Sequence, residues 1–290
     1  RPCALDRELT NPRPPGKTNM TTSDHQPQDL GTLLYEVRDH VAVITLNRPE
    51  RMNTLGGTMK ADLARAFFEL ARTDDQVRAV LVTGSGDRAF CAGADIKERA
   101  GEVVCGSEYF VRQKATHDLF RNIEEFEKPV IAAINGVALG GGLEIALCCD
   151  IRLAASTARF GLPEIKLGVI PAAGGTQRLP RVIGEARAKE LILMADLIDA
   201  NTALGMGLVS RVMPAEELFS TAMDWAKRLA QHPPLAVRFA KRAINRGMQT
   251  DLDSGLEYER YAASMLVDSE DRVEGMRAFV EKRAPRFVGR

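Results

Sequence analysis

Short runs of apolar residues alternate with stretches of helical spacing over the first half of the chain. The runs predict five strands, at residues 34–37, 41–46, 77–82, 129–134 and 150–155. Apolar side chains three or four positions apart predict helices with one buried face: Met59, Leu63, Phe67 and Leu70, then Leu119, Ile123 and Phe126. Apolar strands that alternate with helices are typical of a parallel sheet covered on both faces. We therefore predict an α/β core.

The second half of the chain carries a different pattern. From about Gly184 onward, apolar residues recur only at helical spacing, as at Leu218, Ala222, Ala226 and Leu229. We therefore expect a core over residues 32–185, followed by a helical region over residues 186–290.

Residues 1–31 resemble neither part. They contain five prolines and no apolar segment of the kind that a secretory signal needs, and Asp6 and Glu8 argue against a transit peptide. The chain begins with Arg1, and Met20 is an internal candidate start. We expect a disordered leader or extraneous sequence and a cytoplasmic protein; the alternative is a degraded targeting segment and a location in the mitochondrial matrix.

Composition narrows the class of function. The 39 basic and 39 acidic side chains cancel, so no bulk charge attracts nucleic acid or an anionic membrane. No stretch reaches the roughly 18 apolar residues of a membrane helix. The five cysteines form no C-x-x-C pair and the four histidines are scattered, so neither a disulfide framework nor a metal site is predicted. Cys91, Cys148 and Cys149 are interpreted as small core residues.

Three glycines, at positions 140–142, open a predicted helix that is apolar apart from Glu144. A helix N-terminus has N–H groups without partners, and glycine lets another molecule approach them. A carboxylate among apolar residues is costly to bury. Two interpretations remain open at this point: a chemical role for Glu144, or a tight turn from which it reaches solvent.

A second loop of small residues, Gly93-Ala94, follows the strand at 77–82, and Asp95 is placed to start a short helix. Loops after parallel strands lie at one end of a sheet, where open α/β folds bind ligands. Two N–H donors aimed at one point would make an oxyanion hole.

Glu164 is a second isolated carboxylate, directly after Pro163. Its ordinary interpretation is an acidic residue in the first turn of a helix. Two carboxylates beside an oxyanion hole would instead supply a base and an acid. Arg178 is interpreted as structural, linking the sheet to the helical region. The chain has no G-x-S-x-G, G-x-G-x-x-G or Walker motif.

Five segments resemble the crotonase, or enoyl-CoA hydratase/isomerase, superfamily, in the family order, over about residues 33–287. They are Asn47–Pro49 with Asn53, Phe90–Lys97, Asn135–Gly142 with Glu144, Phe160–Glu164 leading to Gly174–Leu179, and Glu274–Phe287. The resemblance implies a spiral of ββα units. It also implies a C-terminal helical region that supports homotrimers, often paired into hexamers.

The same resemblance implies roles for single residues. The N–H groups of Ala94 and Gly141 would bind the thioester oxygen of an acyl-CoA, and Glu144 and Glu164 match the two glutamates of the hydratases. Lys282 would approach the 3′-phosphoadenosine end, from a neighbouring subunit. The further residues expected to line the substrate and its CoA are Arg51, Met52, Ala92, Asp95, Ile96, Lys97 and Gly140.

The implied reaction is syn addition of water to a trans-2-enoyl-CoA, giving a 3-hydroxyacyl-CoA as in β-oxidation. No metal or redox cofactor is expected, because CoA enters as part of the substrate. Within the fold, the alternatives are isomerisation of a 3-enoyl-CoA and hydration of a branched substrate such as 3-methylglutaconyl-CoA, with residues 103–109 lining the acyl pocket. RNA binding, or a scaffold without activity, is the non-enzymatic alternative.

Overall fold

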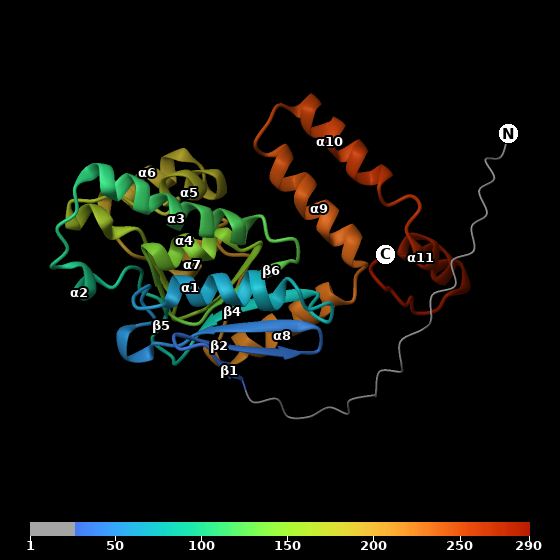
Figure 1. Cartoon of the computed structure of the whole chain (residues 1–290), viewed down its shortest axis with the longest axis horizontal. Helices are drawn as coiled ribbons and strands as arrows, with labels where there is room; N and C mark the ends of the chain where they lie inside the picture. Colours follow the sequence, from blue (N-terminus) through green and yellow to red (C-terminus); the bar gives the residue numbers. More distant parts are fainter. Residues whose placement is uncertain (1–26) are drawn as a thin grey trace.

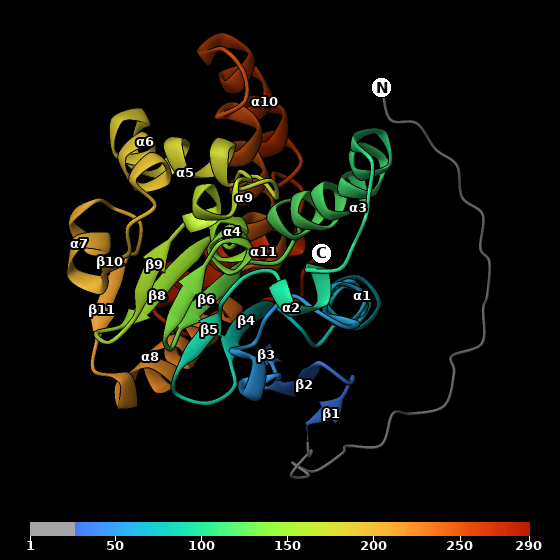
Figure 2. The ribbon, with the colours of Figure 1, turned by 90° about the vertical axis from the view of Figure 1, so that its left-hand side faces the viewer.

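The computed structural model describes residues 27–290, and its centre is a seven-stranded sheet (Figures 1 and 2). Strands β1 to β4 of this sheet are followed by β6, β8 and β11. β1, β2 and β3 pair antiparallel, and the remaining neighbours pair parallel. The strands are β1 Gln28–Asp29, β2 Leu33–Arg38, β3 Val41–Leu46, β4 Ala79–Gly84, β6 Val130–Ile134, β8 Ile151–Ala155 and β11 Arg211–Met213. The predicted strands all lie in this sheet.

A second, smaller sheet carries the loops of interest. It contains β10 Ile198–Asp199, β9 Arg159–Gly161, β7 Val137–Leu139 and β5 Ala89–Cys91, in that order. β5 runs parallel to β7, which runs parallel to β9. None of these strands was predicted from the sequence, because segments of two or three residues are too short to show a period of two.

Helices cover both faces of the large sheet. On one face, α8 Ala215–Ala230 packs its buried Leu218, Ala222 and Ala226 against Val43 and Leu81. On the other lie α1 Met59–Ala64, continued by a π-helical segment Arg65–Ala71, then α3 Gly106–Glu124 and α4 Gly141–Cys148 (Figure 2). This confirms the prediction of a parallel sheet covered on both sides.

Apart from α8, the helices that follow α4 form two groups. α5 Gly175–Ile183, α6 Glu185–Met194 and α7 Ala200–Gly205 lie beside the small sheet. α9 Pro234–Gly247 and α10 Leu252–Ser264 pack together, and with α11 Glu270–Glu281 they extend away from the sheets (Figure 1). Many apolar side chains of this second group are exposed, among them Leu256, Met265, Met276 and Phe279.

Two expectations need correction. The prediction of helices alone beyond about Gly184 is wrong, because β10 and β11 lie there and β11 pairs with β8. The leader was expected to reach residue 31, but β1 pairs with β2 and Leu30 is buried, so ordered structure begins before Leu33. Residues 1–26, with Cys3 and Met20, lie outside the described residues.

Three of the described cysteines lie in the core, as the sequence predicted. Cys91, Cys148 and Cys149 are buried and make no disulfide, whereas Cys105 is exposed. Burial raises the pKa of the Cys91 thiol to about 12. They are therefore core residues and not activated nucleophiles. Within residues 27–290, no helix is both long enough and apolar enough to cross a membrane.

Candidate active site

The first loop of the site follows β5. Ala92 N donates to Met52 O (3.0 Å), and Leu55 N donates to Gly93 O (2.7 Å). The fully buried Asn53 anchors the preceding strand, because its Nδ2 donates to Ala89 O at 2.8 Å. These bonds fix the path of the chain into α2 Ile96–Arg99, which starts after Asp95 as predicted.

The second loop follows β7 and enters α4 through Gly140. Because β5 and β7 are parallel neighbours, both loops leave the small sheet at the same edge. The loops touch: a Cβ built on Gly93 would lie 2.8 Å from Leu139 O and 3.2 Å from Gly141 N. Only glycine, here at φ +88°, allows this approach.

This contact brings together the two amides named in the sequence analysis. Gly141 N–H is in the first turn of α4, and Ala94 N–H lies in the loop before α2. Within residues 27–290, neither N–H donates a hydrogen bond to another backbone or side-chain acceptor. Two unused donors therefore lie on contacting loops, as an oxyanion hole requires, and the hole itself stays a prediction.

Glu144 projects from the first turn of α4 and is only 2% exposed. Its Oε1 accepts from Ala173 N and from Gly175 N, both at 2.7 Å. Burial raises the pKa of Glu144, and these two N–H donors oppose the rise by stabilising the carboxylate. Glu144 is therefore a buried acid whose ionised form is held by hydrogen bonds.

Glu164 lies in the 3-10 helix Pro163–Leu167 and has a different environment. Its Oε2 is buried and has no hydrogen-bond partner in the part of the chain that the structure describes. Burial raises the pKa of Glu164 to about 7, and the charge of Glu144 contributes in the same direction. Near neutral pH this carboxyl is poised between its two protonation states, as general acid catalysis requires.

The predicted CoA-lining residues fall into two groups. Arg51, Ile96 and Lys97 are exposed next to the first loop, whereas Ala92 and Met52 are half-buried. The buried Asp95 is engaged by protein groups: its Oδ2 lies 3.4 Å from Arg48 Nη2 and 3.7 Å from Arg51 Nη1. Its side chain thus ties the 48–51 loop to α2.

Lys282 is remote from these residues within one chain. It caps the C-terminus of α11, at the opposite end of the molecule from α2 (Figure 1). Any contact of Lys282 with a ligand at the amides would therefore have to come from a second copy. Val103 and Phe110, in and beside the predicted acyl-lining segment, are 99% and 80% exposed.

Other residues near the site have no signal in the sequence. The N–H groups of Ala173 and Gly175 bind Glu144 across about thirty positions of sequence, and no local pattern signals that contact. Gln113 and His117, from α3, reach the same loop at Ala172 O. Among residues 27–290, no three His, Cys, Asp or Glu side chains gather as metal ligands would.

Arg178 has a structural role, but not the one expected. Its Nε and Nη2 donate to Glu124 Oε2 on α3, at 2.9 and 2.8 Å, and its Nη1 donates to Ala173 O at 3.1 Å. It therefore joins α5 to α3 and to the loop that holds Glu144, and not the sheet to the C-terminal helices.

This fold places two contacting amide loops beside one buried glutamate, Glu144, and one half-buried glutamate, Glu164. The profile of the enoyl-CoA hydratase/isomerase family matches residues 36–290. The chain belongs to this family.

Several relatives lie within it. The chain is 44% identical to a short-chain-enoyl-CoA hydratase of Clostridium acetobutylicum, over 88% of this chain and 97% of the relative. It is 43% identical to a crotonyl-CoA hydratase of Syntrophomonas wolfei, over 89% and 98%. A crystal structure of an enoyl-CoA hydratase from Bacillus anthracis superposes with a TM-score of 0.85, at 42% identity, covering 89% of this chain and all of the other.

Proposed function

We propose that this enzyme hydrates a trans-2-enoyl-CoA to a 3-hydroxyacyl-CoA. The proposal is carried by two unused main-chain donors, at Ala94 and Gly141, and two glutamates that differ in their hydrogen bonding. Glu144 is buried, and Glu164 is half-buried with one buried oxygen. Hydratase names among relatives above 40% identity support the same reaction.

In the proposed mechanism, the thioester oxygen accepts hydrogen bonds from Ala94 N–H and Gly141 N–H. Addition at C3 moves negative charge onto this oxygen as an enolate, and fixed donors stabilise it; removing one such donor in other enzymes costs about 10²–10³ in rate. Because the donors are held by the fold, they need no reorganisation during the reaction.

The two glutamates divide the proton transfers. Glu144, whose carboxylate is held by two N–H groups, accepts a proton from water as the water oxygen bonds to C3. Glu164, whose pKa is raised to about 7, delivers its proton to C2 of the enolate. Water is consumed, and the proton that Glu144 gained then passes to Glu164 by way of solvent, which returns both carboxyls to their starting states.

The substrate supplies its own CoA, and the reaction needs no redox or metal cofactor, since only water and protons move. We assign the CoA to the exposed surface of Arg51, Ile96 and Lys97. Gly140, Met52, Ala92 and the backbone of Asp95 complete this lining. Lys282 would reach the 3′-phosphate from a neighbouring subunit, since its own α11 lies at the far end.

That role for Lys282 requires an oligomer, and we propose a homotrimer or a dimer of trimers. The apolar side chains exposed on α10 and α11, such as Leu256 (51%), Met265 (67%) and Phe279 (86%), support it, because a monomer rarely exposes so much apolar surface. Sedimentation velocity at micromolar protein would give three or six times the chain mass; a monomer would contradict the proposal.

The activity itself is tested with a panel of enoyl-CoA thioesters of increasing length and branching, including crotonyl-CoA and 3-methylglutaconyl-CoA. The absorbance of the conjugated thioester should fall as water adds. A matched 3-enoyl-CoA tests isomerisation, in which that absorbance would rise. Loss of signal with any 2-enoyl thioester supports hydration, and no turnover of the whole panel would contradict it.

A further inference from the structure

The loop 171–175, which holds Glu144, is itself held by side chains of α3. Gln113 Nε2 donates to Ala172 O at 2.8 Å, and His117 Nε2 lies 2.5 Å from the same oxygen. A carbonyl oxygen can only accept, so this contact requires a hydrogen on His117 Nε2. Two side chains one turn apart on α3 therefore converge on one carbonyl.

That carbonyl belongs to the peptide unit that binds Glu144. Ala172 C=O and Ala173 N–H are the two ends of a single planar amide, and Ala173 N–H donates to Glu144 Oε1 at 2.7 Å. A hydrogen bond received by the oxygen polarises the amide and strengthens the donor at its other end. The order of contacts is thus α3 side chain, Ala172 carbonyl, Ala173 N–H, Glu144 carboxylate.

The second amide that binds Glu144 is supported in the same sense. Gly175 N–H donates to Glu144 Oε1, and the carbonyl of that peptide unit, Gly174 O, accepts from Gln177 N and Arg178 N at the start of α5. One amide is therefore polarised by helix backbone, and the other by Gln113 and His117. Of the two, only the Ala172–Ala173 amide can be altered by substituting side chains.

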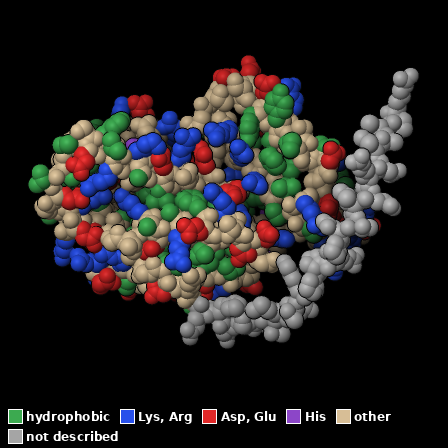
Figure 3. Space-filling model, viewed as in Figure 1, with side chains coloured by type: hydrophobic (Ala, Val, Ile, Leu, Met, Phe, Trp, Pro, Cys, Tyr) green, Lys and Arg blue, Asp and Glu red, His purple; other side chains and the backbone are tan. Residues whose placement is uncertain are grey.

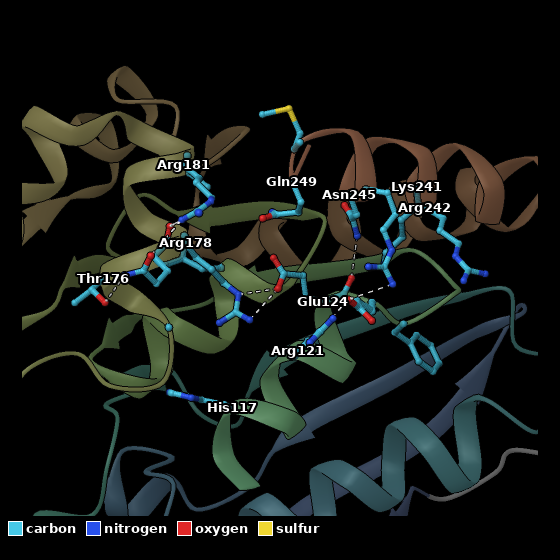
Figure 4. A pocket seen from close by; sticks show the side chains of 18 of the residues that line it. His117, Arg121, Glu124, Thr176, Arg178, Arg181, Lys241, Arg242, Asn245 and Gln249 are labelled. Atoms are coloured by element: carbon cyan, nitrogen blue, oxygen red, sulfur yellow. Dashed lines mark hydrogen bonds and ion pairs between the residues drawn. The ribbon is translucent and has the colours of Figure 1, made fainter. Parts of the chain in front are cut away.

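The α3 side chains are reachable from solvent. Gln113, His117 and Ala172 border a cavity of about 1060 Å³ between α3, α5 and α9, which touches neither Glu144, Glu164 nor Gly141 (Figure 4). Lys and Arg side chains from α5 and α9 gather over this region of the surface (Figure 3). Substitutions at positions 113 and 117 thus act from outside the site.

We infer that Gln113 and His117 are positioning residues for Glu144, acting through the Ala172–Ala173 peptide. Neither side chain contacts Glu144 by a hydrogen bond; both fix and polarise the amide that does. This role rests on the proposed function only in so far as Glu144 takes part in the reaction. The peptide linkage itself can be tested without turnover.

Other charged groups face Glu144 and must be held constant in that test. Arg178 on α5 and the imidazole of His117 act to lower the pKa of Glu144 through their charge, whereas burial acts to raise it. Glu164 interacts with it from the 3-10 helix, and the neutral Cys148 Sγ donates to Glu144 O on α4 itself. Gln113→Ala leaves all of these in place, so it isolates the hydrogen bond from any change in charge.

The variants are Gln113→Ala and His117→Ala, which remove a donor, and His117→Gln, whose Nε2 can restore one. The matched controls are Asn122→Ala, an exposed amide on the same helix, and His232→Ala, an exposed histidine outside α3. The first readout is the infrared carbonyl band of protonated Glu144, titrated with pH and assigned by its loss in Glu144→Gln. The second is the acidic limb of the kcat profile against pH.

Weaker donation to the carboxylate should raise the apparent pKa of Glu144 by roughly half a unit to one unit in Gln113→Ala and His117→Ala. Both controls should titrate like the wild type, and KM should change less than kcat. His117→Gln restores the donor but not the charge of His117, so its titration should lie closer to that of the wild type than the titration of His117→Ala does. A wild-type titration in both alanine variants would overturn the inference. If the wild type lacked hydratase activity, the proposed function would fail. The infrared titration would still show whether Gln113 and His117 act on Glu144, so failure of the function and failure of this inference are distinguishable.

Discussion

Glu164 lies directly against Gly140, at the entrance to α4. A Cβ at Gly140 would lie 2.9 Å from Glu164 Oε1, and the backbone there has φ +51° and ψ −126°. The residue before the predicted oxyanion donor Gly141 is thus the residue on which the second carboxyl rests. Gly140 therefore helps to position both the N–H of Gly141 and the carboxyl of Glu164.

Gly140→Ala should therefore damage both stability and activity. The methyl group displaces the Glu164 carboxyl, and the backbone strain alone is of order 1–3 kcal/mol. Thermal unfolding and crotonyl-CoA hydration measure the two effects. Gly205→Ala is the control, because a Cβ there meets nothing within 4 Å and the site is helical; equal losses in both variants would contradict the assigned contact.

The pH dependence of kcat/KM follows from the two carboxyls. Activity needs Glu164 protonated and Glu144 ionised in the proposed mechanism, so the rate should fall above about pH 7 as Glu164 loses its proton. It should also fall at low pH, below the raised pKa of Glu144. A profile that stays flat from pH 6 to about 9 would contradict the role given to Glu164.

The titration of Glu164 should also change the stability of the protein with pH, in a direction that follows from its raised pKa. The folded pKa of Glu164, about 7, lies above its ordinary value of 4.5, so the native state binds more protons than the unfolded state between these values. The free energy of unfolding should therefore decrease as pH rises through that window. Glu164→Gln lacks this titration, so Tm of the wild type minus Tm of the variant should decrease from pH 4.5 to pH 7; a constant difference would refute the burial argument.

Arg178→Lys should weaken the junction of α3 and α5. Lysine keeps the charge but cannot span both Glu124 Oε2 and Ala173 O as the guanidinium does. The free energy of unfolding in urea should fall by roughly 1–3 kcal/mol. Arg187→Lys, at an exposed position on α6, should leave it unchanged, and an equal loss there would show that the effect is not specific to this junction.

The central strands β3, β4 and β6 of the large sheet were predictable because they are buried almost throughout and consist of apolar runs. β5, β7 and β9 were not, because each has three residues and their pairing depends on chain segments tens of residues apart. β11 was missed for the same reason, since its partner β8 is more than fifty residues earlier. A strand can be predicted from its sequence only when it is long enough to show an apolar run or an alternating pattern.

At the site, the glutamates and glycine loops could be identified from the sequence because they are locally unusual. Glu144 is a carboxylate in an otherwise apolar helix, and the glycine loops are runs of small residues directly after strands. Gln113 and His117 are not unusual on the exposed side of α3, so their contact with Ala172 O emerges only from the packing of α3 on the 171–175 loop. The positions given to substrate, CoA and neighbouring subunits stay predictions.

The central claim is that two glutamates beside two main-chain amides add water to an enoyl thioester. Glu164→Gln tests it most directly, because glutamine preserves the shape of the side chain but has no proton to deliver at this pKa. Crotonyl-CoA hydration should fall by roughly 10²–10⁴, while calorimetric binding of a saturated acyl-CoA stays within a few-fold of the wild type. Full hydratase turnover in this variant would contradict the account.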